Sequence, residues 1–318
     1  MRTRYTALAT LCGTLLIFSY SLFLFSSKSR FQRATFKGEK ERMRTILSTE
    51  EPLIFIGGIP RTGTTLLRVM LDAHQRIRCG EETVLIPYIL TDRERWSQGM
   101  TAGSNVTEQV IDAAVSAFIV EVIAKHGQPA ARYCNKDPFS SWYNTYLAKI
   151  FPNAKFIVLI RDSRAVVHSI LSRRLPVSGF VFDDEEECFR VWNENMKKMV
   201  GQCRQVGNNC LLVHYESLVI SPRKEMEKIL KFLNEPWSEQ VLEHEKHIGE
   251  ININPLEFSS NQVVKQVYQN ALHQWKGYFS DSLLHKVAQL APMMETLGYE
   301  PKNTNPDYSQ FCIAEDDD

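Results

Sequence analysis

A strand, a glycine-rich loop and a helix follow one another between residues 53 and 72. The apolar run Leu53–Ile56 leads into Gly57 and Gly58, and apolar residues recur with helical spacing from Leu66 onwards. Backbone N–H groups of a glycine-rich turn at a helix start converge on one point, where the helix dipole also favours an anion. The segment therefore predicts a phosphate-binding loop, with an empty tight turn as the alternative. The loop residues are Arg61, Thr62, Gly63, Thr64 and Thr65.

The loop departs from the pattern of nucleoside triphosphatases at one position. Gly58 and Gly63 have the right spacing, but Thr64 stands where those enzymes carry a lysine that bridges phosphates beside a magnesium ion. Because Arg61 lies inside the loop instead, a ligand with one 5′-phosphate group and no obligatory metal fits better. A small-molecule kinase, which would hydrolyse ATP with magnesium, is disfavoured.

Two further apolar runs predict a three-layer α/β domain. Lys155–Ile160 is typical of a strand buried on both faces, and Leu211–Tyr215 is a weaker run of the same kind. With the first strand they predict a parallel sheet whose ligands bind beyond the carboxyl ends of its strands. No repeat and no second domain is evident. Helices are predicted at 107–127 between caps at Thr107 and Gly127, at 164–174, at 222–233 after a Ser221 cap, and at 282–297.

A second anion site is predicted at the tip of the strand 155–160. Arg161 follows this strand directly, and Ser169 and Arg173 are four residues apart in the predicted helix, so they share a face. The three side chains would form a pocket for a second phosphate. A surface cluster of arginines is the alternative, but a nucleoside with phosphate at both ends would need two such sites.

The N-terminal segment predicts one membrane span. Residues 6–27 carry no charge and are long enough to cross a hydrocarbon core of about 30 Å. A cleaved signal peptide is the alternative, although no small-residue cleavage site follows the run. Basic residues on both sides leave the orientation open. We expect a tail at 1–5, the anchor at 6–27, a polar stem at 28–50, one domain at 51–300 and a C-terminal tail at 301–318.

Charge and cysteine content restrict the class of protein. The 37 basic and 37 acidic side chains balance, which argues against a nucleic-acid binder.

All but one of the 7 cysteines follow the apolar segment. A bridge between Cys79 and Cys134 is favoured, and closing its loop of about 55 residues would be worth about 4 kcal/mol. Cys203 and Cys210 could staple a turn, whereas six buried thiols remain the alternative and the state of Cys188 and Cys312 stays open.

The motifs resemble those of the tyrosylprotein sulfotransferases, which transfer sulfate from 3′-phosphoadenosine 5′-phosphosulfate to protein tyrosines. The resemblance runs from about residue 52 to about residue 299 and rests on Pro60–Leu66, Leu71–His74 and Arg78–Thr83. It implies a sulfotransferase fold, this phosphosulfate as sulfate donor, and tyrosine-containing protein substrates with acidic residues nearby. It also implies a homodimeric, single-span type II Golgi membrane protein with a lumenal catalytic domain, and it agrees with both suggested disulfides. In the lumen, the acceptor triplet at Asn105 would be open to N-glycosylation.

Candidate catalytic groups follow the loop. A free glutamate has a pKa of about 4.3 and a phenol one of about 10, so Glu81 or Glu82 would need help from the site to act as a base. Lys136 and Arg61 suit the stabilisation of charge on a transferred sulfuryl group. A buried salt bridge of Lys136 with Asp137 or Glu81 is the alternative. The resemblance assigns the general base to Glu82, the second of the pair.

The resemblance implies further cofactor contacts. It gives the 3′-phosphate to Arg161, Ser169 and Arg173, and it places Ser259 against the bridging oxygen, where it assists the leaving group. Tyr215 and the segment 259–268 would close over the cofactor. The residues of that segment are Ser259, Ser260, Asn261, Gln262, Val263, Val264, Lys265, Gln266, Val267 and Tyr268.

Three positions depart from the family pattern. Gln274 stands where the family carries a cofactor-binding lysine, for which Lys276 could substitute. Val84 and Tyr88 stand where the family carries arginines that contact acidic substrate residues, so the acidic preference is open to doubt. Compensating charge could come from Arg93 and Arg95.

Two other functions remain as alternatives, namely a carbohydrate sulfotransferase and a catalytically weak lumenal homologue that only binds the cofactor. The cysteines and histidines have no spacing typical of metal ligands, so we predict no structural zinc.

Overall fold

The computed structural model describes residues 47–100, 103–249, 251, 253–254, 257–267 and 269–312, without the side chains of Met100 and Asn261. The residues from Leu47 onwards belong to one compact unit. The predicted tail and membrane anchor, and the stem up to residue 46, lie outside the described residues. Within the described ranges, no helix combines the length and apolar character needed to cross a membrane.

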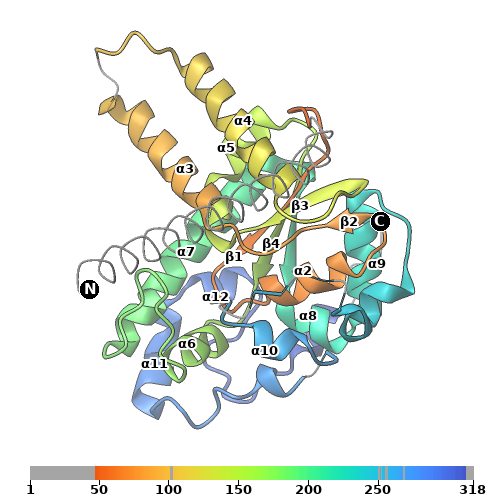
Figure 1. Cartoon of the computed structure of the whole chain (residues 1–318). Helices are drawn as coiled ribbons and strands as arrows, with labels where there is room; N and C mark the ends of the chain where they lie inside the picture. Colours follow the sequence, from red (N-terminus) through yellow and green to blue (C-terminus); the bar gives the residue numbers. More distant parts are fainter. Residues whose placement is uncertain are drawn as a thin grey trace, which may run out of the picture. The chain divides into compact units, whose positions relative to one another are not determined.

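A parallel sheet of five strands forms the centre of this unit, in the order β2-β3-β1-β4-β5 (Figure 1). Ile56 of β1 pairs with Lys136 of β3 on one side and with Ile157 of β4 on the other, so these strands end at the same edge of the sheet. The parallel sheet was predicted from three of its strands and is confirmed. The strands are β1 (Ile54–Gly58), β2 (Ile77–Arg78), β3 (Arg132–Lys136), β4 (Lys155–Ile160) and β5 (Cys210–His214).

Helices cover both faces of the sheet, which confirms the predicted three-layer arrangement. Ile54, Ile157 and Val213 pack against one group of helices, whereas Phe55 and Phe156 point to the opposite face. The first group is α2 (Thr64–Asp72), α8 (Tyr215–Ile220) and α9 (Pro222–Leu233). The other face carries α3 (Leu85–Arg95), α4 (Glu108–Lys125), α5 (Asn144–Ile150), α6 (Ser163–Leu171) and α7 (Glu185–Val206). Further along the chain follow α10 (Ser260–Val263), α11 (Asp281–Leu290) and α12 (Met293–Thr296).

Some predicted helix limits are right and others are wrong. The Thr107 side chain caps α4 as expected by accepting a hydrogen bond from the Val110 N–H. Ser221 stands at the start of α9, but its side chain makes no capping hydrogen bond. The helix predicted at 282–297 is two helices, because Pro292 lacks the N–H that a continuous helix needs.

The end of α6 corrects one argument about the second anion site. The helix stops at Leu171, and Arg173 lies in the exposed turn that follows it. Ser169 and Arg173 therefore do not share a helical face, contrary to the prediction.

Two disulfides join the segments that the cysteine spacing suggested. Cys79, directly after β2, is bonded to Cys134 in β3, and Cys203 near the end of α7 is bonded to Cys210 at the start of β5. The alternative of six buried thiols is wrong. Cys188 and Cys312 are free, the former buried.

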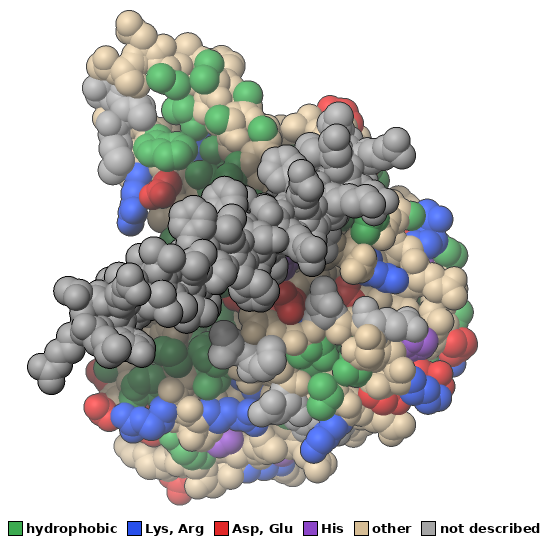
Figure 2. All heavy atoms as spheres, in the orientation of Figure 1, with side chains coloured by type: hydrophobic (Ala, Val, Ile, Leu, Met, Phe, Trp, Pro, Cys, Tyr) green, Lys and Arg blue, Asp and Glu red, His purple; other side chains and the backbone are tan. Residues whose placement is uncertain are grey.

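The surface of α3 and α4 is unusually apolar. Figure 2 shows hydrophobic side chains on this pair of helices. On α4 they include Val110 and Phe118, and around the start of α3 they include Val84, Leu85 and Tyr88.

Candidate active site

The loop between β1 and α2 has the conformation that an anion-binding turn needs. Arg61 and Gly63 both have left-handed backbone angles, with φ of 79° and 98°. The Thr62 hydroxyl donates to the Ile59 carbonyl at 2.8 Å and fixes the turn from inside. Thr64 and Thr65 are the first residues of α2, so their N–H groups belong to the helix start that favours an anion.

The guanidinium of Arg61 ties this loop to distant segments. Its Nε donates to the Ser169 hydroxyl of α6 at 3.0 Å. Its Nη1 donates to the Ser259 hydroxyl at 2.5 Å and to the Phe258 carbonyl at 3.2 Å, and its Nη2 donates to Gln262 Oε1 at 2.6 Å. A single buried arginine thus joins the phosphate loop, α6 and the segment before α10.

Arg161 lies beside Arg61 at the tip of β4. Its Nη1 donates to the Arg61 carbonyl at 2.8 Å and its Nη2 to the Ala271 carbonyl at 2.7 Å. Its guanidinium lies 4.3 Å from the centre of the Tyr215 ring. The buried Nε has no hydrogen-bond partner among the described residues, which leaves a donor for a ligand.

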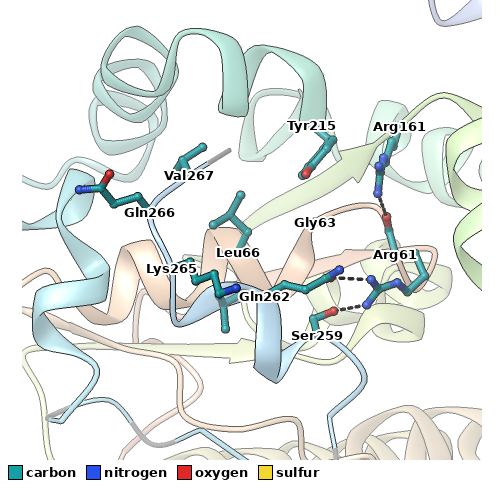
Figure 3. A pocket seen from close by; sticks show the side chains of 11 residues that line it. Arg61, Gly63, Leu66, Arg161, Tyr215, Ser259, Gln262, Lys265, Gln266 and Val267 are labelled. Carbon is teal, nitrogen blue, oxygen red and sulfur yellow. Dashed lines mark hydrogen bonds between the residues drawn. The ribbon is translucent and has the colours of Figure 1, made fainter. Parts of the chain in front are cut away.

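These residues line an open cleft. Figure 3 shows Arg61 and Arg161 at one end of it, Gln266 and Val267 at the other, and Leu66 between them. Among the described residues that line it, the charged side chains are those of arginine and lysine, so the cleft suits an anionic ligand. The lining residues are Arg61, Gly63, Leu66, Arg161, Tyr215, Ser259, Gln262, Val263, Lys265, Gln266 and Val267.

A buried ion cluster adjoins this cleft through residues 257–259. Lys136 Nζ at the end of β3 is fully buried and donates to Glu82 Oε2 at 2.7 Å and to Glu257 Oε2 at 3.2 Å. The Glu82 N–H donates to Glu257 Oε1 at 2.8 Å. The side chain of Glu82 is 31% exposed, so this carboxylate alone in the cluster reaches solvent to a large extent.

The surroundings of Glu82 and Glu257 shift the pKa values of the two carboxylates in opposite directions. Burial raises the pKa of Glu82 above the ordinary glutamate value; Lys136 opposes this shift, while Asp137 and Glu257 add to it. For Glu257, burial by itself would raise the pKa, but Lys136, the Glu82 N–H and Arg68 outweigh burial and lower it. Glu82 is therefore the better proton acceptor of the pair and Glu257 the more firmly ionised.

Comparisons with known proteins agree with this geometry. A model described as the sulfotransferase family matches residues 52–239. The chain is 46% identical over 270 residues to protein-tyrosine sulfotransferase 2 of Gallus gallus, with 82% of this chain and 73% of the relative covered. It is 45% identical over 273 residues to protein-tyrosine sulfotransferase 1 of Danio rerio, with 83% and 77% covered. The chain belongs to the protein-tyrosine sulfotransferase family.

The fold of this sulfotransferase also matches solved structures. The sulfotransferase domain of the Synechococcus PCC 7002 olefin synthase superposes with a TM-score of 0.57 at 22% identity, covering 81% of this chain and 98% of that domain. A likeness at this level of identity supports the sulfotransferase fold alone.

Most of the predicted site residues of this sulfotransferase come together, but not all of them. Ser169 contacts Arg61, whereas Arg173 is exposed and does not line the cleft. Within the predicted segment 259–268, Ser260 is buried and donates to the Glu257 carbonyl, and Val264 points to solvent. Tyr268 and the side chain of Asn261 lie outside the described residues.

Two predicted alternatives for charged residues are corrected. Lys136 does form a buried salt bridge, but its partners are Glu82 and Glu257 rather than Asp137 or Glu81. Asp137 instead accepts from the Thr83 hydroxyl and the Val84 N–H, which fixes the start of α3.

The expected substitute for a missing cofactor lysine lies elsewhere. Lys276 is exposed and donates to Asn305 Oδ1, and it is absent from the lining of the cleft. Lys265 does line the cleft, so it is the lysine that this sulfotransferase presents there.

Sequence reasoning missed Glu257 altogether. It lies 175 residues from Glu82 and 121 from Lys136, and no spacing pattern links positions so far apart. Lys136 itself gave no warning, because its strand β3 has no apolar run from which its burial could be predicted.

Proposed function

We propose that this chain transfers the sulfuryl group of 3′-phosphoadenosine 5′-phosphosulfate to the hydroxyl of tyrosine residues in proteins. The observation that carries the proposal is that residues 257–259 connect the anion cleft with the cluster of Glu82 and Lys136. The chain is also 45 to 46% identical to proteins named for tyrosine sulfotransfer. The bond from sulfur to the phosphate oxygen breaks and a bond from sulfur to the phenol oxygen forms. The phenol proton passes to Glu82, and 3′-phosphoadenosine 5′-phosphate leaves.

The cleft suits the phosphosulfate, which supplies the activated sulfuryl group when bound. Gly63 and Thr64 at the start of α2 would hold the 5′ end, with Arg61 close by. Arg161 would serve the 3′-phosphate, since its buried Nε lacks a partner among the described residues. Tyr215 packs against both Gly63 and Arg161 and would close one wall of the cleft.

The residues of the chain divide the chemical work. Glu82 takes the proton, and its raised pKa brings it closer to the basicity that a phenol requires. Lys136 and Arg61 stabilise negative charge as the group is transferred. Ser259, which accepts from Arg61, would assist the leaving oxygen.

We further propose that the chain is a type II Golgi membrane protein with a lumenal catalytic domain that forms homodimers. Support comes from the uncharged segment at 6–27 and from the two disulfides, which are typical of oxidising compartments. Asn105 is exposed, as an N-glycosylation site must be. The proposal keeps the short tail at 1–5 and the anchor at 6–27, with a stem that leads to the compact unit beginning at Leu47 instead of ending at residue 50.

The family resemblance leads us to expect substrates with acidic residues near the acceptor tyrosine. The surface beside Glu82 gives this expectation little support. Val84 and Tyr88 are exposed there in place of cations. Arg93 is paired with Asp112, and Arg95 with Asp92. We therefore limit the proposal to tyrosine-containing proteins.

Transfer from a labelled sulfate donor to a tyrosine peptide tests the function. The wild type should label the peptide, whereas Glu82→Gln should lower kcat by about 100-fold or more, the range for loss of a general base. Glu81→Gln makes the same charge change one residue earlier and should retain activity. A homologue that only binds the cofactor would bind 3′-phosphoadenosine 5′-phosphate without labelling the peptide, and a carbohydrate sulfotransferase would label glycans instead.

A further inference from the structure

Glu257 occupies the centre of the ion cluster without a role in the reaction as described so far. One of its oxygens accepts from the Glu82 N–H at 2.8 Å and the other from Lys136 Nζ at 3.2 Å. Its side chain is only 8% exposed. From the opposite side, Arg68 Nη2 of α2 lies 3.8 Å from Glu257 Oε1, and Arg68 is itself paired with Asp72 at 3.0 Å.

Proton transfer to Glu82 would leave the buried Lys136 without an ionised partner if Glu257 were absent. Glu82 Oε2 is bonded to Lys136 in this structure, and a proton taken up by the Glu82 carboxylate removes the negative charge that holds this ion pair together. A buried lysine that is left without any ionised carboxylate strongly destabilises the folded protein. Because Glu257 stays on Lys136, the cation keeps a partner and its position while Glu82 takes up the proton.

The same residue fixes the backbone of the base. The Glu82 N–H is held by Glu257 Oε1, so the main chain stays in place while the side chain takes up the proton. Glu257 is also followed directly by Phe258 and Ser259, both of which accept from Arg61 of the phosphate loop. One short segment therefore sets the distance between the anion cleft and the base.

We propose that Glu257 is a positioning residue of the transfer reaction: it holds Lys136 and the Glu82 backbone in place while the Glu82 carboxylate takes up the proton of the acceptor hydroxyl. The proposal rests on the proposed function. Among the described residues, the charged groups that act on Glu82 are Lys136, Asp137 and Glu257, and those around Glu257 are Lys136, Arg68 and Glu82 itself.

Glu257→Gln separates this role from a structural one, because glutamine keeps an oxygen for the Glu82 N–H but removes the charge. The negative charge of Glu257 no longer disfavours ionisation of Glu82, and Lys136 has Glu82 as its remaining carboxylate. Both changes favour the ionised form of Glu82. The acid limb of the profile of kcat against pH should move to lower pH by roughly one unit. The plateau of kcat should fall by about tenfold, since Glu82 is held more tightly on Lys136. Affinity for 3′-phosphoadenosine 5′-phosphate should change by less than about threefold.

Carbon-13 NMR titration of the Glu82 carboxyl, assigned with Glu82→Gln, measures the same shift without turnover. It therefore remains decisive even if the wild type sulfates no tyrosine peptide, a result that would count against the proposed function alone. Glu243→Gln removes an exposed carboxylate paired with Lys246 and should move neither the limb nor the titration.

An unchanged Glu82 titration and acid limb in a folded Glu257→Gln variant would overturn the proposal and leave Glu257 a purely structural residue. If that variant does not fold, Glu257→Asp decides. It keeps the charge beside Lys136, so the Glu82 pKa should remain raised. A Glu82 pKa at the ordinary glutamate value in this variant would equally overturn the proposal.

Discussion

Gly63 shows how closely a single residue is matched to the cofactor loop. A β-carbon at this position would lie 2.4 Å from Cδ2 of the Tyr215 ring, and the φ of 98° disfavours any other residue. The same ring lies over the guanidinium of Arg161, so a displaced Tyr215 would disturb both anion sites together.

We expect Gly63→Ala to weaken binding of 3′-phosphoadenosine 5′-phosphate by about tenfold or more, because strain and clash together cost roughly 2 kcal/mol. Isothermal titration calorimetry measures this loss. Gly201→Ala is the matched control, since Gly201 lies within α7, its φ is not positive and no atom lies within 4 Å of the added carbon. Equal affinity in wild type and Gly63→Ala would show that the loop tolerates the methyl group.

Individual site residues were predictable where local spacing determines them. The loop from Arg61 to Thr65 and the strand-tip position of Arg161 follow from a strand, a turn and a helix in sequence. The contact of Arg61 with Gln262 was not predictable, because 201 residues separate the two. It depends on how a distant segment folds back over the loop.

The strands differ in how far their sequences predict them. β4 is a continuous apolar run and was predicted with the limits that the structure shows. β3 has the sequence RYCNK and is fully buried, yet it has no apolar run to identify it. Each of its polar residues is paired: Arg132 lies 3.6 Å from Glu235, Asn135 donates to Asp137, and Lys136 belongs to the site. A strand that buries paired polar residues lacks the usual apolar strand pattern.

The start of α3 follows Glu82 closely in the sequence and exposes apolar side chains. Val84, Leu85 and Tyr88 are 49%, 53% and 66% exposed within six residues of the base. The two arginines further along this helix are paired with aspartates, and Arg93 also stacks on Tyr146 at 4.3 Å. If a peptide approaches Glu82 along this helix, its acidic residues would meet an apolar surface, because both arginines of α3 are paired.

We expect acidic residues beside the tyrosine to give the wild type little gain in kcat/KM. Val84→Arg and Tyr88→Arg should each raise kcat/KM for an acidic peptide by roughly threefold to tenfold over a neutral one, and added salt should reduce the gain. Val110→Arg introduces the same charge on the exposed side of α4 and serves as the control. A strong preference of the wild type for acidic peptides would contradict this reading of α3.

At the scale of the whole molecule, the C-terminal residues stabilise the edge of the sheet that carries the site. The predicted tail at 301–318 includes Tyr308, which is buried and donates to Asp162 Oδ2 directly after Arg161. Tyr299 donates to Glu216 Oε2, and the Asp162 N–H donates to Glu216 Oε1. Asp162 and Glu216 directly follow Arg161 and Tyr215 in the chain, so this network supports both cleft residues. No local sequence pattern indicates the network.

Glu216 gives this network a pH dependence. Complete burial raises its pKa from 4.5 to about 7, with Asp162 adding to the shift and the hydrogen bonds from the Asp162 N–H and Tyr299 opposing it. Between these two values the folded state holds a proton that the unfolded state has lost. The contribution of Glu216 to stability is therefore largest at low pH and falls as pH rises from 4.5 to about 7.

Glu216→Gln should abolish this fall, because glutamine resembles the protonated acid and does not titrate. Urea unfolding at a series of pH values measures the free energy of unfolding of both proteins. The variant should gain on the wild type by up to about 3 kcal/mol between pH 4.5 and 7. Buried histidines change the slope of both curves alike, so the difference between the curves isolates Glu216. Parallel curves would mean that Glu216 is ionised in the folded protein, and the network behind Arg161 would then hold a buried negative charge.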